Sequence, residues 1–139
     1  MKFEDFIRKG VVKKTIRDIG KIKALIKSTK EDFEYIEGLK IIDISSRKLT
    51  SNYYEILRSI LEAIAFDKGY KVYSHKAFYY FLLEIQESII AEKFDRYRQI
   101  RNAINYYGKP ISTEEANEYI KEMKEMINYL LDKYLGEFK

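Results

Sequence analysis

The sequence contains no cysteine and no tryptophan, and only one proline and one histidine among its 139 residues. The lack of cysteine excludes disulfides and thiolate zinc sites, and it is typical of proteins in a reducing compartment. One histidine cannot supply the two Glu-x-x-His pairs of a di-iron helical bundle. A glycine-rich phosphate loop and a nucleophile elbow are also missing from the sequence. We therefore expect neither a metal nor a cofactor.

Long apolar runs are missing too, since no stretch approaches about 18 uninterrupted apolar residues. The N-terminal sequence MKFEDFIRKG carries Glu4 and Asp5, which do not suit the basic region of a secretory signal. We expect a cytoplasmic protein without a membrane segment. The length fits a single domain over residues 1–139, because no linker, internal repeat or low-complexity tract interrupts it.

Hydrophobic residues make up 46% and charged residues 35% of the chain, a balance that favours helices packed on helices. The chain is rich in isoleucine, lysine, glutamate and tyrosine, which is typical of a thermophilic host. The net charge is +4, and between Arg8 and Lys30 only Asp18 opposes the basic residues. This basic segment has two interpretations, a solvated helix face or a stripe that faces phosphates.

Apolar residues at three- and four-residue steps predict helices in the first half of the chain. The first spans residues 3–36, either as one rod or as two helices joined by a bend. Residues 37–52 lose the helical period and collect turn-forming residues, so we expect a connection there. A second helix is predicted over residues 49–66, where Gly69 follows as a terminator.

In the second half, Ser74 is predicted to cap a helix that either continues unbroken to Tyr107 or kinks and restarts near Lys93 before reaching it. Gly108 and the following Pro110 end it. Ser112 and Glu115 then form a capping box, which opens a last helix that reaches residue 134. The sequence therefore predicts an all-α fold, an up-and-down bundle of four to five helices.

A polar strip is predicted on the helix that contains RYRQIRNAINYY. Helical spacing places Arg98, Arg101 and Asn105 on one side of this helix, with Asn102 adjacent. Guanidinium and amide groups offer several hydrogen-bond donors in fixed directions, which suits a phosphodiester of RNA. The alternative is an ordinary salt-bridged helix, in which Arg98 pairs with Asp95 or with an acid of the last helix.

The stretch RQIRNAINYYG, followed by a capped helix, resembles the C-terminal signature of HEPN domains. That signature is an arginine, often followed by asparagine, with a histidine four to six residues further on. The stretch NYYEILRSILEAIAFDKGYKVYSHKAF is similar to the second helix and following turn of the family, where a Tyr-Glu pair, a Gly-Tyr-Lys and a Ser-His recur. The resemblance covers residues 52–134 and implies a HEPN-like bundle of four to five helices.

The resemblance also implies a function. HEPN proteins commonly form homodimers that bring two arginine motifs together, and many are metal-independent ribonucleases, often toxins encoded beside a nucleotidyltransferase antitoxin. Others bind RNA or a protein partner without catalysis. In the ribonucleases the arginine stabilises phosphate charge and the histidine handles protons as the ribose 2′-hydroxyl attacks. By this resemblance, Arg101 is the motif arginine and Asn102 the polar residue after it.

The sequence departs from the family at the histidine, because that window holds Tyr106, Tyr107 and Gly108. A tyrosine with a pKa near 10 is a poor base, although it can donate a hydrogen bond or a proton. Either ring could stack on a base, accept a modification from the nucleotidyltransferase, or simply pack on the last helix. His75 would replace the missing imidazole only if it folds back or comes across a dimer; otherwise it is a packing or capping residue.

Three hypotheses follow from the sequence. The first is a HEPN-like homodimer that binds RNA or a protein partner with a degenerate nuclease motif, in a pair with a nucleotidyltransferase. The alternative is an active metal-independent endoribonuclease toxin that uses Arg101 with Tyr106, Tyr107 or His75. The third makes the resemblance architectural, with the arginines placed in a dimer interface.

Overall fold

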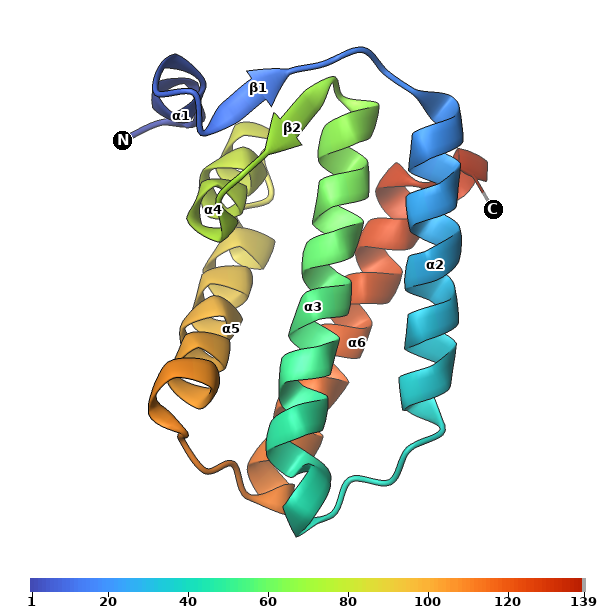
Figure 1. Ribbon diagram of the computed structural model, residues 1–139, viewed down its shortest axis with the longest axis vertical. Helices are drawn as coiled ribbons and strands as arrows, with labels where there is room; N and C mark the ends of the chain where they lie inside the picture. The colour runs from blue at the N-terminus through green and yellow to red at the C-terminus, as the bar shows by residue number, and fades with distance from the viewer. Residues whose placement is uncertain (139) are drawn as a thin grey trace.

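The protein is an all-α helical bundle, as the sequence predicts. The computed structural model describes residues 1–138. In chain order its elements are α1 (Phe3–Arg8), β1 (Val12–Lys14), α2 (Ile19–Glu37), α3 (Asp43–Asp67), β2 (Tyr70–Val72), α4 (His75–Glu84), α5 (Ser88–Tyr107), α6 (Thr113–Tyr134) and the 3-10 turn η1 (Gly136–Phe138). Figure 1 shows α2, α3, α5 and α6 running along the long axis, with β1, β2, α1 and α4 gathered at one end.

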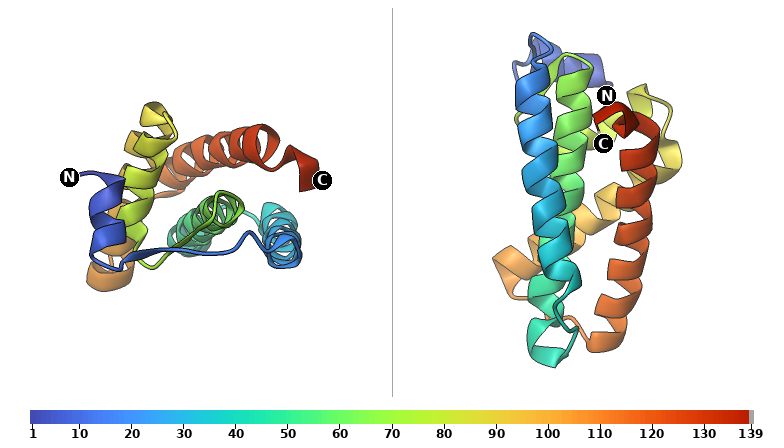
Figure 2. Two further views of the ribbon diagram at one scale, coloured as in Figure 1. Left: turned by 90° about the horizontal axis from the view of Figure 1, so that it is seen from above. Right: turned by 90° about the vertical axis from the view of Figure 1, so that its right-hand side faces the viewer.

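Helix α3 lies at the centre of the bundle. It packs against α2, α5 and α6, and it also contacts β2 and α4. Figures 1 and 2 show α2 and α3 in one layer with α6 behind them, while α5 closes the side opposite α2. The long helices alternate in direction along the chain. Because α3 has neighbours on several sides, its buried residues spread around the helix instead of forming one stripe.

The predicted helix ends around the last loop are confirmed. Gly108 follows α5 in the left-handed region with φ 63°, a conformation that glycine adopts without steric cost. The Ser112 hydroxyl accepts a hydrogen bond from the Glu115 backbone N–H at 3.0 Å, and the Glu115 carboxylate accepts one from the Ser112 N–H at 3.1 Å. This capping box satisfies two otherwise free donors and starts α6.

The prediction of one continuous helix over residues 3–36 is wrong; there are two helices, as in the second alternative, but a strand and not a simple bend separates them. Helix α1 ends at Arg8, and Gly10 turns the chain with φ 75°. Strand β1 then pairs antiparallel with β2, with Val12 opposite Val72. Helix α2 starts only after Asp18, whose carboxylate accepts a hydrogen bond from the Lys21 N–H at 3.1 Å. The basic segment from residue 8 to 30 is therefore divided among a short helix, a strand and a long helix.

The predicted connection over residues 37–52 is largely helix, because α3 begins at Asp43. Its residues look like turn formers, but three of their hydroxyl groups form hydrogen bonds with the helix backbone. Ser45 accepts a hydrogen bond from the Ile42 N–H at 3.0 Å, which caps the start. Ser46 and Thr50 each donate to the carbonyl oxygen four residues earlier, both at 2.7 Å. Such back-bonding lets serine and threonine lie within a helix.

The break between α4 and α5 lies earlier than the predicted position near Lys93. It falls at Gln86, which has φ 62°, an uncommon value for a residue other than glycine. The chain reverses there, so α4 and α5 pack as an antiparallel hairpin (Figure 1). Ser74 is the N-cap residue of α4, but contrary to the prediction its side chain makes no capping hydrogen bond. The hairpin places the start of α4 beside the middle of α5.

Candidate functional site

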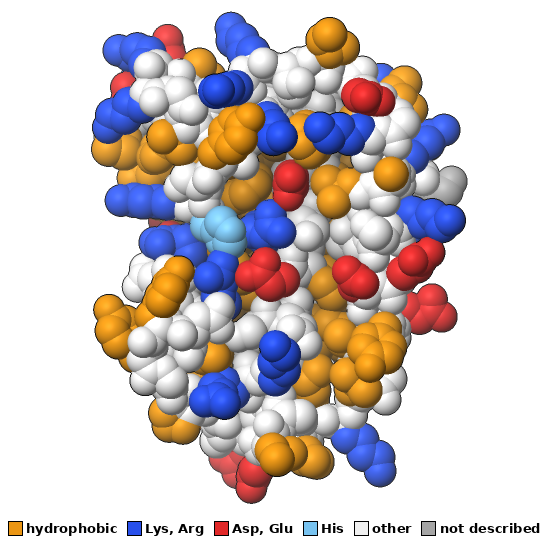
Figure 3. Space-filling view, in the orientation of Figure 1, with side chains coloured by type: hydrophobic (Ala, Val, Ile, Leu, Met, Phe, Trp, Pro, Cys, Tyr) orange, Lys and Arg blue, Asp and Glu red, His pale blue; other side chains and the backbone are white. Residues whose placement is uncertain are grey.

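Polar side chains from three helices meet where α4 begins. Tyr54 and Arg58 are four residues apart on α3 and so share one face of it. Strand β2 carries the chain from the end of α3 to His75, the first residue of α4. The hairpin then brings Arg101 of α5 to the same place. Figure 3 shows the single histidine at this surface with Lys or Arg side chains beside it and acidic side chains close by.

His75 Nδ1 is the focus of this arrangement. It lies 2.9 Å from the Tyr54 hydroxyl oxygen and 2.8 Å from Nη2 of Arg101. The guanidinium can only donate, so Nδ1 accepts and the neutral ring carries its proton on Nε2. The Tyr54 ring also stacks on the imidazole, with centroids 5.8 Å apart, and lies 5.0 Å from the Arg101 guanidinium. We call Tyr54, His75 and Arg101 the His75 centre.

Arg101 has one carboxylate partner that a ligand could replace and one N–H donor without a hydrogen-bond partner among the described residues. Its side chain is only 12% exposed, and its Nη2 lies 3.2 Å from a Glu55 carboxylate oxygen, whereas the Glu55 side chain is 44% exposed. The Arg101 Nε is buried without a hydrogen-bond partner among residues 1–138. The other Glu55 oxygen accepts from Arg58 Nε at 3.1 Å, and Arg58 also bonds Glu62. A ligand anion could displace the exposed carboxylate and satisfy the orphan donor.

The rest of the predicted polar strip is divided. Arg98 donates to Asp95 from Nε at 2.9 Å and lies 2.8 Å from it through Nη2, so the salt-bridged interpretation is confirmed for this residue. Asn102 lies beside Arg101, with its side-chain oxygen 3.4 Å from Nη1. Asn105 is exposed one turn further along α5. Of the predicted phosphate-binding residues, only Arg101 therefore contacts His75.

Tyr106 and Tyr107 lie away from the His75 centre. Their side chains are 72% and 86% exposed at the end of α5, so neither ring packs into the core as the packing interpretation predicts. A helix rises about 1.5 Å per residue, which puts them roughly 7 to 9 Å beyond Arg101 along the axis. Within the described residues, no hydrogen bond or ring contact joins either tyrosine to His75. Within a single chain, the fold therefore places His75, and neither of these tyrosines, next to Arg101.

The pKa of His75 is lowered from 6.5 to about 4, mainly because burial disfavours the charged ring and secondly because Arg101 is a cation beside it. The imidazole is therefore neutral at pH 7. Burial likewise raises the pKa of Tyr54 well above its usual value, so its hydroxyl keeps its proton. The centre at neutral pH consists of one cation, one neutral imidazole and one phenol.

We expect an NMR titration to give a pKa near 4 for His75, which is the only histidine and so has an unambiguous ring signal. Arg101→Ala should move this pKa up towards 6.5, because it removes a cation and admits water. Arg47→Ala removes the same charge from an exposed position of α3 and should leave the titration unchanged. Equal shifts in both variants would contradict the proposed contact.

The lowered pKa also sets the sign of a pH effect on stability. Between pH 6.5 and about 4 the unfolded chain binds a proton at His75 that the folded protein does not. The free energy of unfolding should therefore decrease as the pH falls through this range. His75→Gln should remove this part of the pH dependence.

Sequence reasoning missed Tyr54, Glu55 and Arg58 as site residues. The Tyr-Glu pair was visible within the resemblance, and Arg58 follows on the same helix face. What connects them to Arg101 is the packing of α5 against α3, which the helical period of either segment alone does not define.

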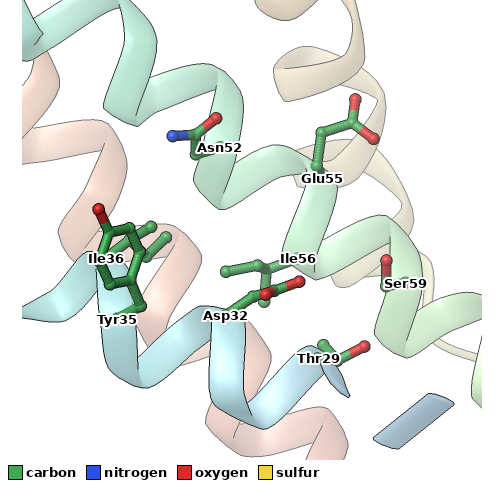
Figure 4. A pocket seen from close by; sticks show the side chains of 8 residues that line it. All are labelled: Thr29, Asp32, Tyr35, Ile36, Asn52, Glu55, Ile56 and Ser59. Atoms are coloured by element: carbon green, nitrogen blue, oxygen red, sulfur yellow. The ribbon is translucent and has the colours of Figure 1, made fainter.

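A groove of about 260 Å³ lies beside the centre, between α2 and α3. Tyr35 and Asp32 line it from α2, and Asn52 and Ile56 line it from α3 (Figure 4). Glu55 also borders the groove, and Figure 4 shows its side chain rising on the side away from Asp32. The carboxylate that bonds Arg101 thus separates the groove from the His75 centre.

Comparison of the chain with family models, curated proteins and solved structures found no match. The likeness to HEPN domains therefore stays a prediction from the quoted motifs. In the described part of the chain, no cluster of three or more histidine, aspartate or glutamate side chains is placed to hold a metal ion. None of the helices within residues 1–138 has both the length and the apolar character needed to cross a membrane.

Proposed function

We propose that the protein binds RNA at the His75 centre, with Arg101 holding a phosphate. The observation that carries this proposal is the state of Arg101, a mostly buried guanidinium with one orphan donor and a half-exposed carboxylate partner. A phosphodiester has two non-bridging oxygens that share one negative charge, so one oxygen can replace Glu55 on Nη2 while the other accepts from Nε. The start of α4 adds backbone N–H groups that favour an anion.

RNA suits the centre better than a free anion because of the neutral imidazole beside the arginine. The Nε2–H of His75 is a donor without a formal charge, which suits a ribose hydroxyl or a base oxygen. The resemblance to HEPN domains favours the same ligand. A homodimer and a nucleotidyltransferase partner stay predictions from that resemblance.

A second candidate function is metal-independent RNA cleavage, and the contact between His75 and Arg101 favours it. In this reaction the ribose 2′-oxygen bonds to the adjacent phosphorus and the bond to the 5′-oxygen breaks, giving a cyclic phosphate and a 5′-hydroxyl. Nδ1 of His75 would take the 2′-hydroxyl proton and return it to the leaving oxygen. Arg101 and the Tyr54 hydroxyl must first turn away from Nδ1, and Arg101 then stabilises the phosphate charge.

The test of RNA binding compares two variants with opposite expected signs. Fluorescence anisotropy with a labelled single-stranded RNA in EDTA should show that Arg101→Ala weakens binding by about 10- to 150-fold, the value of a hydrogen bond to a charged group. Glu55→Gln should strengthen binding up to about fivefold, because it removes the competing carboxylate from a half-exposed ion pair. Arg47→Ala is the charge-matched control.

A decrease in affinity in both Arg101→Ala and Glu55→Gln would mean that the ion pair only maintains the fold. No RNA binding by the wild type, with a changed molar mass of Arg101→Ala in light scattering, would instead favour arginines in a dimer interface. The same RNA samples run on a denaturing gel test the second candidate. Cleavage that persists in EDTA and is lost in His75→Gln would support it, and cleavage lost only in Tyr106→Phe/Tyr107→Phe would assign it to the tyrosines.

A further inference from the structure

The two-stranded ribbon β1–β2 has a basic face, which carries Lys13 and Lys71, opposite the face on which Val12 is buried. Lys13 is directly opposite Lys71 in the antiparallel register, so the two side chains lie on the same face of the ribbon. Val12, the strand neighbour of Lys13, points to the opposite face and is fully buried. The lysine Nζ atoms lie 5.6 Å and 5.4 Å from the ring centroid of Tyr73, which is itself 56% exposed.

This pairing of two lysines is unfavourable in the protein alone. Like charges directly opposite each other destabilise a strand pair. An ion pair with a nearby carboxylate would reduce the repulsion between the two ammonium groups. Across residues 1–138, neither Lys13 nor Lys71 forms an ion pair. Contact with the Tyr73 ring offsets only part of the repulsion, since an exposed cation–π contact is worth about 0.5–1 kcal/mol. An anion between the two ammonium groups would reverse the sign of the interaction.

The basic face leads directly to the His75 centre. Tyr73 precedes His75 by two residues, and two extended residues span at most about 7 Å. Figure 3 shows Lys and Arg side chains beside the histidine and again nearer the end of the molecule where the ribbon lies, with other atoms between the two groups. A nucleic-acid backbone with one phosphate at Arg101 can therefore place a neighbouring phosphate at the ribbon.

We propose that Lys13 and Lys71 form a second phosphate site, which holds the backbone of single-stranded RNA next to the phosphate bound at Arg101. The exposed Tyr73 ring gives an adjacent base a surface on which to stack. The identity of the ligand as RNA rests on the proposed function. The ribbon then has a direct role in recognition, in addition to covering the ends of α3 and α4.

The test uses the salt dependence of binding, which reports the number of phosphates that a protein contacts. A labelled single-stranded RNA of about 12 nucleotides is titrated in EDTA at several salt concentrations. Each phosphate contact on a single strand contributes about 0.7 to the slope of log K against log salt, so loss of the one phosphate held by the two lysines should lower the slope of Lys13→Gln/Lys71→Gln by about 0.7. At 0.1 M salt this corresponds to roughly fivefold weaker binding, if the proteins bind equally at 1 M.

The control is Lys23→Gln/Lys27→Gln, which removes the same charge from exposed positions of α2 and should leave the slope unchanged. The thermal midpoint of Lys13→Gln/Lys71→Gln should stay equal or rise, because a like-charge pair is removed. An unchanged slope in this variant, or the same loss in the control, would overturn the ribbon site. The proposed function would survive that result if Arg101→Ala still weakens binding. No RNA binding by the wild type would overturn both.

Discussion

Replacing Phe94 with alanine is expected to lower the free energy of unfolding by about 3–5 kcal/mol. Phe94 has no exposed surface, and its ring centroid lies 5.5 Å from that of Tyr54 and 6.2 Å from that of Phe78. It thus fills the space where α5 meets α3 and α4. Truncation removes the apolar contacts and leaves a cavity that backbone shifts only partly close. Denaturation by urea, followed by circular dichroism, measures the loss.

The matched control is Ile89→Ala on the same helix, where the side chain is 71% exposed and the expected change is within about 0.5 kcal/mol. Phe94→Ala should also raise the pKa of His75, because Phe94 supports the Tyr54 ring that stacks on the imidazole. A large loss of stability with an unchanged His75 titration would show that the core and the His75 centre are independent. Equal, small losses in both variants would contradict the packing described.

Glu87→Ala is expected to cost about 2–3 kcal/mol of unfolding free energy. The Glu87 carboxylate is buried at the start of α5 and accepts hydrogen bonds from three side chains of α6. Tyr129 donates at 3.0 Å, Lys133 lies 3.0 Å away, and Tyr134 donates a short hydrogen bond. Without the carboxylate these donors can bond only to water, and the turn between α4 and α5 loses its hydrogen bonds to α6.

The cost of Glu87→Ala should depend on pH. Burial opposes ionisation of Glu87, but the hydrogen bonds from Tyr134, Lys133 and Tyr129 outweigh it and lower its pKa below 4.5. A lowered pKa contributes stability above the unfolded value, and that contribution is lost as the pH falls through the folded value. Wild type and variant should therefore differ at pH 7 and converge in acid. Glu118→Ala, an exposed position of α6, should show neither effect.

Features that depend on neighbouring residues could be predicted from the sequence. The capping box at Ser112 and the left-handed Gly108 need only a few adjacent residues, and both are present as expected. The amphipathic periods likewise identified α6 and most of α3. The ribbon could not be found this way, because Val12 pairs with Val72, far along the chain, and neither three-residue strand carries a pattern of its own.

The candidate site shows the same division between local and distant information. A local motif identifies Arg101 and Asn102, and the same motif puts the partner of Arg101 in the next few residues of the helix. The sequence offers His75 only as an alternative that requires the chain to fold back or a dimer to form. Tyr106 is five residues on, and at about 100° per residue it lies roughly 140° around the helix. His75 is 26 residues away in sequence but 2.8 Å away in space. Only the reversal at Gln86 makes that contact, and its sequence, IQE, contains no glycine or proline.

The ribbon also bears on how the molecules behave towards one another. It consists of two strands, so each strand has an outer edge whose backbone groups could pair with a strand of another molecule and begin aggregation. Three residues per strand and lysines at 13, 14 and 71 oppose such pairing, since short, charged edges are common means of preventing it. Two of these lysines, Lys13 and Lys71, are the ones that we propose to bind RNA, and they would therefore also oppose aggregation while no RNA is bound.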